Sequence, residues 1–96
     1  MVTMEALRAK RVDILRLAER WGAHDVRVFG SVARGDAGPQ SDVDFLVAFD
    51  ADRSLLDHGG LLMDLQDLLD CDVDVVSETG IRPRLRERIL KEALPL

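Results

Sequence analysis

The sequence predicts an α/β domain, or α+β in a stricter classification, in which helices pack on a three-stranded mixed sheet. Three segments space their apolar residues as helices do, three short segments alternate apolar and polar residues, and a glycine-rich turn region follows the first of these strands. The expected order is therefore helix, strand, turn, strand, helix, strand, helix. At 96 residues the chain is expected to form one domain, residues 1–96.

The first part of the chain is expected to hold a helix, a strand and a turn. The helix covers residues 3–21, with Thr3 as its N-cap, Glu5 in its first turn and Gly22 as its stop. Residues 25–29 alternate as a strand does, and residues 30–39 contain three glycines and a proline, which predicts a turn with room for a short helical turn at its start. The residues assigned to the core are Leu7, Ile14, Leu17, Ala18, Trp21 and Phe29.

A second strand and a second helix follow the turn. Residues 42–49 alternate, so that Val43, Phe45 and Val47 share one face of the strand. Residues 54–69 are expected to be helical, opened by a capping box at Ser54 and weakened by its two glycines at about 1 kcal/mol each. The residues expected to line its buried side are Leu55, Leu62, Leu65 and Leu69.

The last part of the chain is expected to add a third strand and a final helix. Residues 72–76 alternate, and Pro83 suits the first position of the helix, whose expected buried stripe is Leu85, Ile89 and Ala93. The second and third strands are joined through a helix, which allows parallel pairing. The first and second are joined by a turn, which favours antiparallel pairing.

Composition limits the classes of function. The formal charge of −5 argues against direct nucleic-acid binding, because that affinity comes largely from neutralising phosphates. The single Cys71 cannot form an internal disulfide or a cysteine zinc cluster, which favours a reducing compartment. No apolar run approaches the roughly twenty residues that span a bilayer, and residues 1–5 lack the layout of a signal peptide. We expect a cytoplasmic protein with no membrane partner.

Paired carboxylates are the first chemical signal. Asp42 and Asp44 are two positions apart on a strand, so they face the same way with Cα atoms roughly 6.6 Å apart. A cation would relieve their repulsion, and oxygen donors suit Mg²⁺ or Mn²⁺. Asp74, central in the third strand, is the preferred third carboxylate, with Asp72 as the alternative; three acids around two ions suit in-line displacement at phosphorus. A solvated strand face would also account for the pair.

A Gly-Ser pair is the second signal. Gly30 and Ser31 stand where the first strand ends, where a glycine lets the backbone approach an anion, although a plain strand-ending turn would use the same residues. Gly-Ser, then ten residues, then Asp-x-Asp at 42–44 resembles the signature of minimal nucleotidyltransferases, small relatives of the DNA polymerase beta superfamily. Val-Asp-Val-Val at 73–76 resembles that family's third motif. The resemblance covers essentially the whole chain and implies the minimal nucleotidyltransferase fold.

The resemblance also implies a role for each matching residue. Gly30 and Ser31 would hold the β- and γ-phosphates of a nucleoside triphosphate. Asp42 and Asp44 would carry Mg²⁺ on that triphosphate. Asp74 would complete a second metal site and act as general base toward the acceptor hydroxyl. Attack would then proceed in line, with pyrophosphate as the leaving group.

Other charged residues are assigned less specifically. Arg34 is a candidate nucleotide-binding residue, or a turn arginine paired with Asp36. Four arginines crowd the last helix, where an anion or an acidic partner would relieve their charge, unless nearby glutamates on a solvated face already balance it. Neither His24 nor His58 has a partner at ligand spacing. The four arginines are Arg82, Arg84, Arg86 and Arg88.

The resemblance implies a Mg²⁺-dependent enzyme that transfers AMP from ATP to a hydroxyl. Minimal members of the family are typically antitoxins that silence a HEPN-domain RNase toxin by adenylylating one of its tyrosines, as in the MntA-type antitoxins of HEPN/MNT toxin–antitoxin systems. A homo- or hetero-oligomer is expected. The alternatives are a non-catalytic toxin-binding antitoxin module and a small-molecule nucleotidyltransferase completed by a partner chain. No residue of the sequence identifies the base of the nucleotide.

Overall fold

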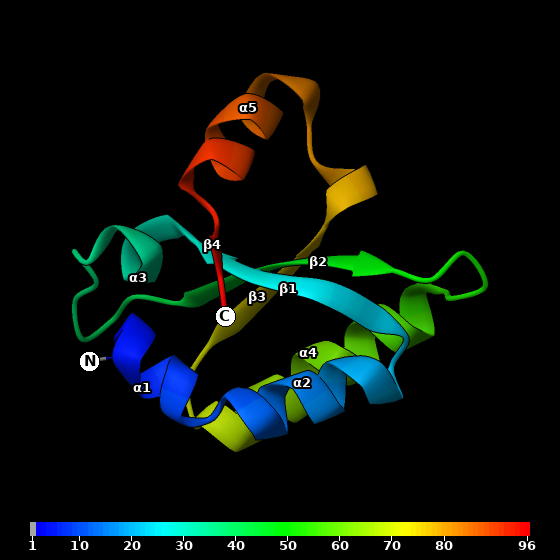
Figure 1. Cartoon of the computed structure of the whole chain (residues 1–96), viewed down its shortest axis with the longest axis horizontal. Coiled ribbons are helices and arrows are strands. Elements are labelled where there is room, and N and C mark those ends of the chain that lie inside the picture. The colour runs from blue at the N-terminus through cyan, green and yellow to red at the C-terminus, as the bar shows by residue number, and fades with distance from the viewer. Residues whose placement is uncertain (1) are drawn as a thin grey trace.

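Four strands form one mixed sheet in the computed structural model, which describes residues 2–96 (Figure 1). They are β1 (Ala23–Phe29), β2 (Val43–Phe49), β3 (Val73–Ser77) and β4 (Leu94–Pro95), in the spatial order β3-β2-β1-β4. β1 and β2 pair antiparallel and β2 and β3 pair parallel, as predicted. The prediction of three strands was one too few. β4 consists of two residues on the far side of β1, too short to show an alternating pattern.

Three helices cover one face of this sheet: α1 (Met4–Ala9), α2 (Arg11–Arg20) and α4 (Leu55–Leu69) (Figure 1). The core lies between them and the sheet, where Val43, Phe45 and Val47 of β2 are fully buried and Val73 and Val75 of β3 are nearly so. This confirms the face predicted for the second strand.

The expected single helix over residues 3–21 is two helices. Thr3 caps α1 as predicted, since its hydroxyl accepts a hydrogen bond from the Ala6 N–H at 3.1 Å. Lys10 breaks the helix: its N–H bonds the Leu7 carbonyl, three residues back. Its side chain reaches the Leu68 carbonyl near the end of α4 at 3.4 Å. The helical spacing of apolar residues continues across the break, so periodicity alone could not reveal it.

The helix α4 begins with the predicted capping box, formed by Ser54 and Asp57. Its buried side is rotated from the expected one, because Leu61 and Leu65 are buried whereas Leu55 is 86% exposed. Leu62 and Leu69 are half-buried against the core. Leu55 is the first residue of α4 and, at about 100° per residue, points roughly 100° away from the side that Leu61 and Leu65 share, which explains the error at Leu55.

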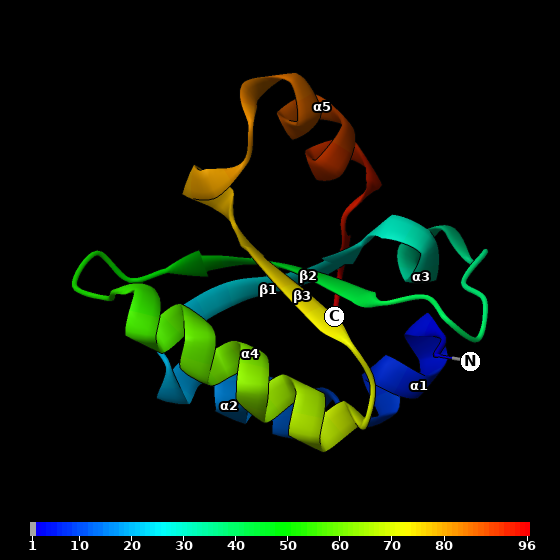
Figure 2. The same cartoon turned by 180° about the vertical axis from the view of Figure 1, so that it is seen from behind.

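The opposite face of the sheet, called here the α5 face, is covered more loosely. It carries α3 (Gly30–Arg34), the 3₁₀ turn η1 (Glu78–Gly80) and α5 (Pro83–Glu92), which rises away from the sheet in Figure 2. Pro83 begins α5 as predicted. The expected buried stripe is wrong, because α5 has no buried residue; Leu85 is 37% exposed, and Ile89 and Ala93 are half-buried. The helix contacts α3 rather than lying flat on the strands, and Leu85 and Ile89 on its apolar side line a cavity.

Within residues 2–96, no helix combines the length and the apolar character that crossing a membrane requires.

Candidate active site

Acidic side chains on β2 and β3 meet on the α5 face. Asp44 is the register partner of Phe29 on β1 and of Asp74 on β3. Adjacent strands lie about 4.8 Å apart, and register partners point to the same face. The side chains on either side of Asp44 and Asp74 along their strands are buried in the core, so Asp44 and Asp74 face away from it; these neighbours are Val43, Phe45, Val73 and Val75. Asp72 precedes β3, where its carbonyl accepts a hydrogen bond from the Val43 N–H at 3.1 Å. The register thus brings Asp74, rather than Asp72, beside Asp44.

Asp44 is the most perturbed carboxyl of this group. Its partial burial and, to a lesser degree, the charges of Asp74, Asp42 and Glu92 together raise its pKa to about 6, against the opposing effect of Arg34. If these acids simply lay on a solvent-exposed strand face, the pKa of Asp44 would not be raised in this way. The acids therefore form an electrostatically coupled cluster, which favours the site interpretation over the solvated-face alternative.

Gly30 adjoins this cluster at the end of β1. Its φ is +74°, a left-handed conformation that only glycine adopts without strain. A Cβ at this position would overlap Oδ2 of Asp44. The short helix α3 begins here, and its first backbone N–H groups have no partner within the helix. A plain strand-ending turn would explain the positive φ of Gly30. It would not explain why the Gly30 backbone also lies against the Asp44 carboxylate.

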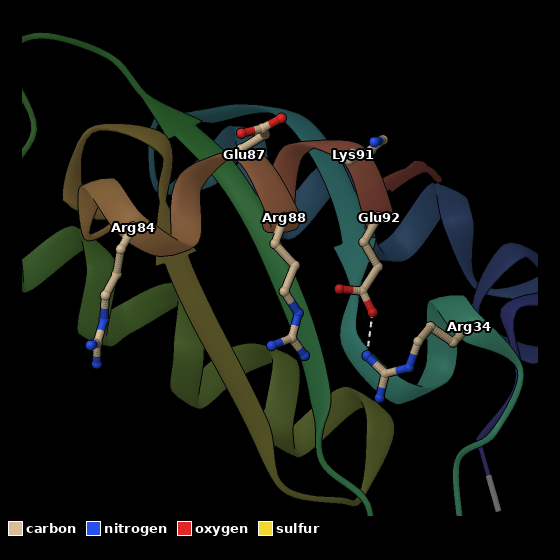
Figure 3. Close-up of a pocket in the computed structure, with 6 residues that line it drawn as sticks. All are labelled: Arg34, Arg84, Glu87, Arg88, Lys91 and Glu92. Atoms are coloured by element: carbon tan, nitrogen blue, oxygen red, sulfur yellow. Dashed lines mark hydrogen bonds and ion pairs between the residues drawn. The ribbon is translucent and has the colours of Figure 1, made fainter.

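Arg34 ends α3 and pairs with two acids. Its guanidinium donates to Asp36 at 3.2 Å, as the turn interpretation predicted, and it also forms an ion pair with Glu92 of α5. Hydrogen bonds to Glu92 and Asp36 raise the pKa of Arg34. The ion pair with Glu92 connects α3 to α5 across the opening of the site (Figure 3).

A cavity of about 350 Å³ lies between the end of β1, α3 and α5. The predicted site residues Gly30, Ser31, Arg34 and Asp44 line it, whereas Asp42 and Asp74 are exposed beside it and do not. Of its remaining walls, only Arg88 was singled out from the sequence, as one of four arginines that an anion would suit; the apolar residues were assigned to the core, and Glu92 was counted among the glutamates that balance charge. These other lining residues are Phe29, Leu85, Arg88, Ile89 and Glu92.

Asp42, Asp44 and Asp74 supply the donor chemistry that Mg²⁺ prefers. Carboxylate oxygens are its usual protein ligands, and a cation would offset the repulsion that raises the pKa of Asp44. In the arrangement described for residues 2–96, no three His, Cys, Asp or Glu side chains converge closely enough to enclose an ion. Since Mg²⁺ commonly takes only one or two carboxylates and completes its shell with water and substrate phosphate, the residues fit such an ion. The two-metal site remains a prediction.

Comparison with known families identifies the fold and the enzyme class. Residues 14–96 match the sequence profile of the nucleotidyltransferase domain. This match covers most of the chain, which therefore belongs to the nucleotidyltransferase family. The resemblance drawn from the Gly-Ser and Asp-x-Asp pattern is thereby confirmed, as is the assignment of the chain as a nucleotidyltransferase enzyme.

Individual relatives support the same assignment. A Methanocaldococcus jannaschii protein with the provisional name of protein adenylyltransferase is 38% identical over 81 residues, which is 84% of this chain and 87% of the relative. The protein adenylyltransferase MntA of Thermococcus cleftensis is 38% identical over 78 residues, 81% of this chain and 79% of the relative.

Solved structures show the same fold. One described as a minimal nucleotidyltransferase is 56% identical, with a TM-score of 0.88 over 99% of this chain and 97% of that one. A second, a tri-AMPylated Shewanella oneidensis HEPN toxin in complex with MNT antitoxin, is 19% identical, with a TM-score of 0.70 over 92% of this chain and 69% of that one. At 19% identity the second likeness concerns the fold alone.

Proposed function

We propose that this nucleotidyltransferase moves AMP from ATP to a hydroxyl of a partner protein, and that it does so as an antitoxin. The acceptor would be a tyrosine of a HEPN-type RNase toxin, and the pair would act in the cytoplasm. The reaction would depend on Mg²⁺ held by Asp42, Asp44 and Asp74, the three acids at the edge of the site.

One observation carries this proposal: Gly30, Asp44 and Asp74 lie side by side although they come from three separate segments. Gly30 adjoins the Asp44 carboxylate, and the register pairs Asp44 with Asp74. Phosphate would contact the turn at Gly30 and Ser31, because a glycine backbone permits close approach. The carboxylates lie directly beside that turn, where a cation bridging protein and phosphate would be needed.

The proposed reaction is a substitution at the α-phosphorus of ATP. The acceptor oxygen forms a bond to this phosphorus, the bond to the β-phosphate oxygen breaks, and its electron pair leaves with pyrophosphate. The hydroxyl proton passes to the Asp74 carboxylate, which is exposed beside the cavity and so can face an acceptor brought by another protein. Bound Mg²⁺ would neutralise the phosphates and the leaving group. Gly30, Ser31 and Arg34 would position the triphosphate.

The relatives support the choice of acceptor. Two proteins 38% identical to this chain over about four fifths of its length carry the name protein adenylyltransferase. A protein with the same fold occurs as MNT antitoxin with a tri-AMPylated HEPN toxin. Asp74 is exposed rather than enclosed by the cavity of about 350 Å³, which suits an acceptor that supplies its own surface.

Transfer of label from α-³²P-ATP with Mg²⁺ to a HEPN-domain protein encoded beside this chain tests the proposal. We expect label on that protein, blocked by changing its acceptor tyrosine to Phe, and lost with the double variant Asp42→Ala/Asp44→Ala. Unlabelled GTP, CTP and UTP, added separately as competitors, would identify the preferred base. Full transfer by the double variant would contradict the metal assignment.

A tight complex without label would instead support the non-catalytic binding module. In that case the variant Asp42→Ala/Asp44→Ala should bind the partner as well as the unchanged protein does. Loss of toxin silencing in the variant, with binding retained, would separate the catalytic proposal from the binding-module alternative.

A further inference from the structure

Arginines from two elements face a second cavity beside the site. Arg34 of α3 and Arg84 and Arg88 of α5 line a cavity of about 570 Å³ (Figure 3). Arg34 and Arg88 also line the smaller cavity that holds Gly30 and Asp44. Glu92, which pairs with Arg34, borders both. The two cavities therefore share a wall, and a ligand bound at Gly30 can extend along α5.

Of the cations in this wall, Arg84, Arg88 and Lys91 have no ion pair within residues 2–96, and Figure 3 shows Lys91 directed to the other side of α5. Arg84 and Arg88 therefore carry the uncompensated positive charge on the side of Arg34. They are four residues apart on α5, so they share one helix face with a rise of roughly 6 Å. Figure 3 shows both guanidinium groups directed away from α5, to the same side as Arg34. Arg34 is paired with Asp36 and Glu92, whereas within residues 2–96 neither Arg84 nor Arg88 has a carboxylate within 4.0 Å or a side-chain hydrogen bond.

The opposite side of the opening carries negative charge, which is unfavourable for binding a polyphosphate. Asp42, Asp44 and Asp74 would repel a polyphosphate, and Arg34 is already held by two acids. The Arg84 and Arg88 guanidinium groups can form forked hydrogen bonds to phosphate oxygens, an arrangement that favours phosphate over other anions.

We propose that Arg84 and Arg88 form a polyphosphate subsite on α5, which takes the pyrophosphate end of the nucleotide. This inference rests on the proposed nucleotidyl transfer. As the bond between the α-phosphorus and the β-phosphate oxygen breaks, the electron pair goes to pyrophosphate. The two guanidinium groups bind that increased negative charge. Neither arginine gains or loses a proton, so both act as binding and positioning residues.

A small anion fits this location better than an acidic protein segment. Arg88 lines the smaller cavity together with Ser31 and Asp44, so this arginine lies beside the turn at which the phosphates of the nucleotide are proposed to bind.

Calorimetric titration of the full chain with inorganic pyrophosphate tests this subsite without any acceptor. The variant Arg84→Gln/Arg88→Gln keeps the side-chain stems and removes both charges. The control Arg11→Gln/Arg16→Gln removes two exposed charges from α2, on the opposite face of the sheet. We expect at least about tenfold weaker pyrophosphate binding for the first variant, with EDTA and with Mg²⁺, and less than about twofold change for the control. Arg84→Lys/Arg88→Lys should recover part of the affinity.

Equal pyrophosphate affinity in the Arg84→Gln/Arg88→Gln variant and the control would overturn the subsite. Normal pyrophosphate binding combined with a lost complex with the HEPN-domain protein would also overturn it and assign the arginines to protein docking. The α-³²P transfer assay tests the proposed nucleotidyl transfer independently of the pyrophosphate subsite. If the unchanged protein transfers no label but pyrophosphate binding still depends on Arg84 and Arg88, the transfer proposal fails and the anion subsite stands.

Discussion

Asp44 links the chemistry of the site to the stability of the fold. Its half-buried carboxyl has a pKa raised to about 6, so the folded protein holds a proton that the unfolded chain releases near the ordinary value of 3.8. The stabilisation from that proton is present below pH 3.8 and is lost as pH rises through 6. At pH 7.5 the ionised Asp44 therefore destabilises the fold.

The variant Asp44→Asn should consequently be more stable than the unchanged protein at pH 7.5. We expect a gain on the order of 1 kcal/mol in EDTA, because solvent screens part of the repulsion, and no gain near pH 3.5. Urea unfolding at the two pH values measures the difference. A gain of the same size at both would show that charge is not its cause. Transfer activity should be lost in this variant.

Gly30 offers a second test at the scale of one residue. Gly30→Ala places a Cβ on the Asp44 carboxylate and forces an alanine to a φ of +74°. Gly35→Ala is the matched control, because Gly35 has a φ of +81° but no atom within 4 Å of the added Cβ. We expect each change to cost about 1 kcal/mol or more in stability. Only Gly30→Ala should reduce transfer, by at least about tenfold. Thermal unfolding measures the backbone strain in both variants, and initial transfer rates measure damage to the site. Equal losses of transfer rate in the two variants would contradict the assignment of Gly30 to the site.

At the scale of elements, the adjacent glycines of α4 have opposite roles. The sequence predicts that both weaken the helix, but a Cβ on Gly60 would lie 2.6 Å from the Trp21 ring, whereas one on Gly59 meets nothing within 4 Å. The Trp21 indole also donates to Asp64 of α4 at 2.7 Å, which fixes the ring in place. Gly59→Ala should therefore stabilise the protein by about 0.5–1 kcal/mol, and Gly60→Ala should destabilise it by about 1–3 kcal/mol through overpacking. Urea unfolding of the two variants checks the contrast, and a gain in both would mean that Trp21 moves aside freely.

The same contrast shows which elements can be predicted from sequence. Strands β1, β2 and β3 alternate, because one face is buried, and Pro83 and Ser54 mark helix starts through local chemistry. The close approach of Gly60 to Trp21 depends on how α2 and α4 pack, which no local pattern records. β4 forms only because the chain end returns to β1, so two residues pair without a strand pattern of their own.

At the scale of the whole molecule, the two faces of the sheet differ in how far sequence predicts them. The motif residues Gly30, Ser31, Asp42, Asp44 and Asp74 could be identified because the family signature lies in the sequence. Their neighbours on α5 could not, because apolar periodicity assigned Leu85 and Ile89 to a core. Since α5 stands away from the sheet, that apolar stripe lines a cavity instead. An amphipathic pattern thus predicts a helix and its inner side, but not whether that side meets protein or ligand.

This unequal packing predicts unequal local stability. The helices α2 and α4 bury side chains in the core, whereas α5 buries none and is tied down by the ion pairs Arg34–Glu92 and, through η1, Arg27–Glu78. Amides of α5 should therefore exchange with solvent through local opening, at least about tenfold faster than those of α4. Glu92→Gln should speed their exchange further without affecting α4, and ATP with Mg²⁺ should slow it, since the nucleotide would join α5 to α3. Hydrogen–deuterium exchange followed by mass spectrometry measures all three effects. Equal protection of α5 and α4 would mean that α5 opens only with the whole domain, and the nucleotide would then have to enter a site already bounded by a rigid wall.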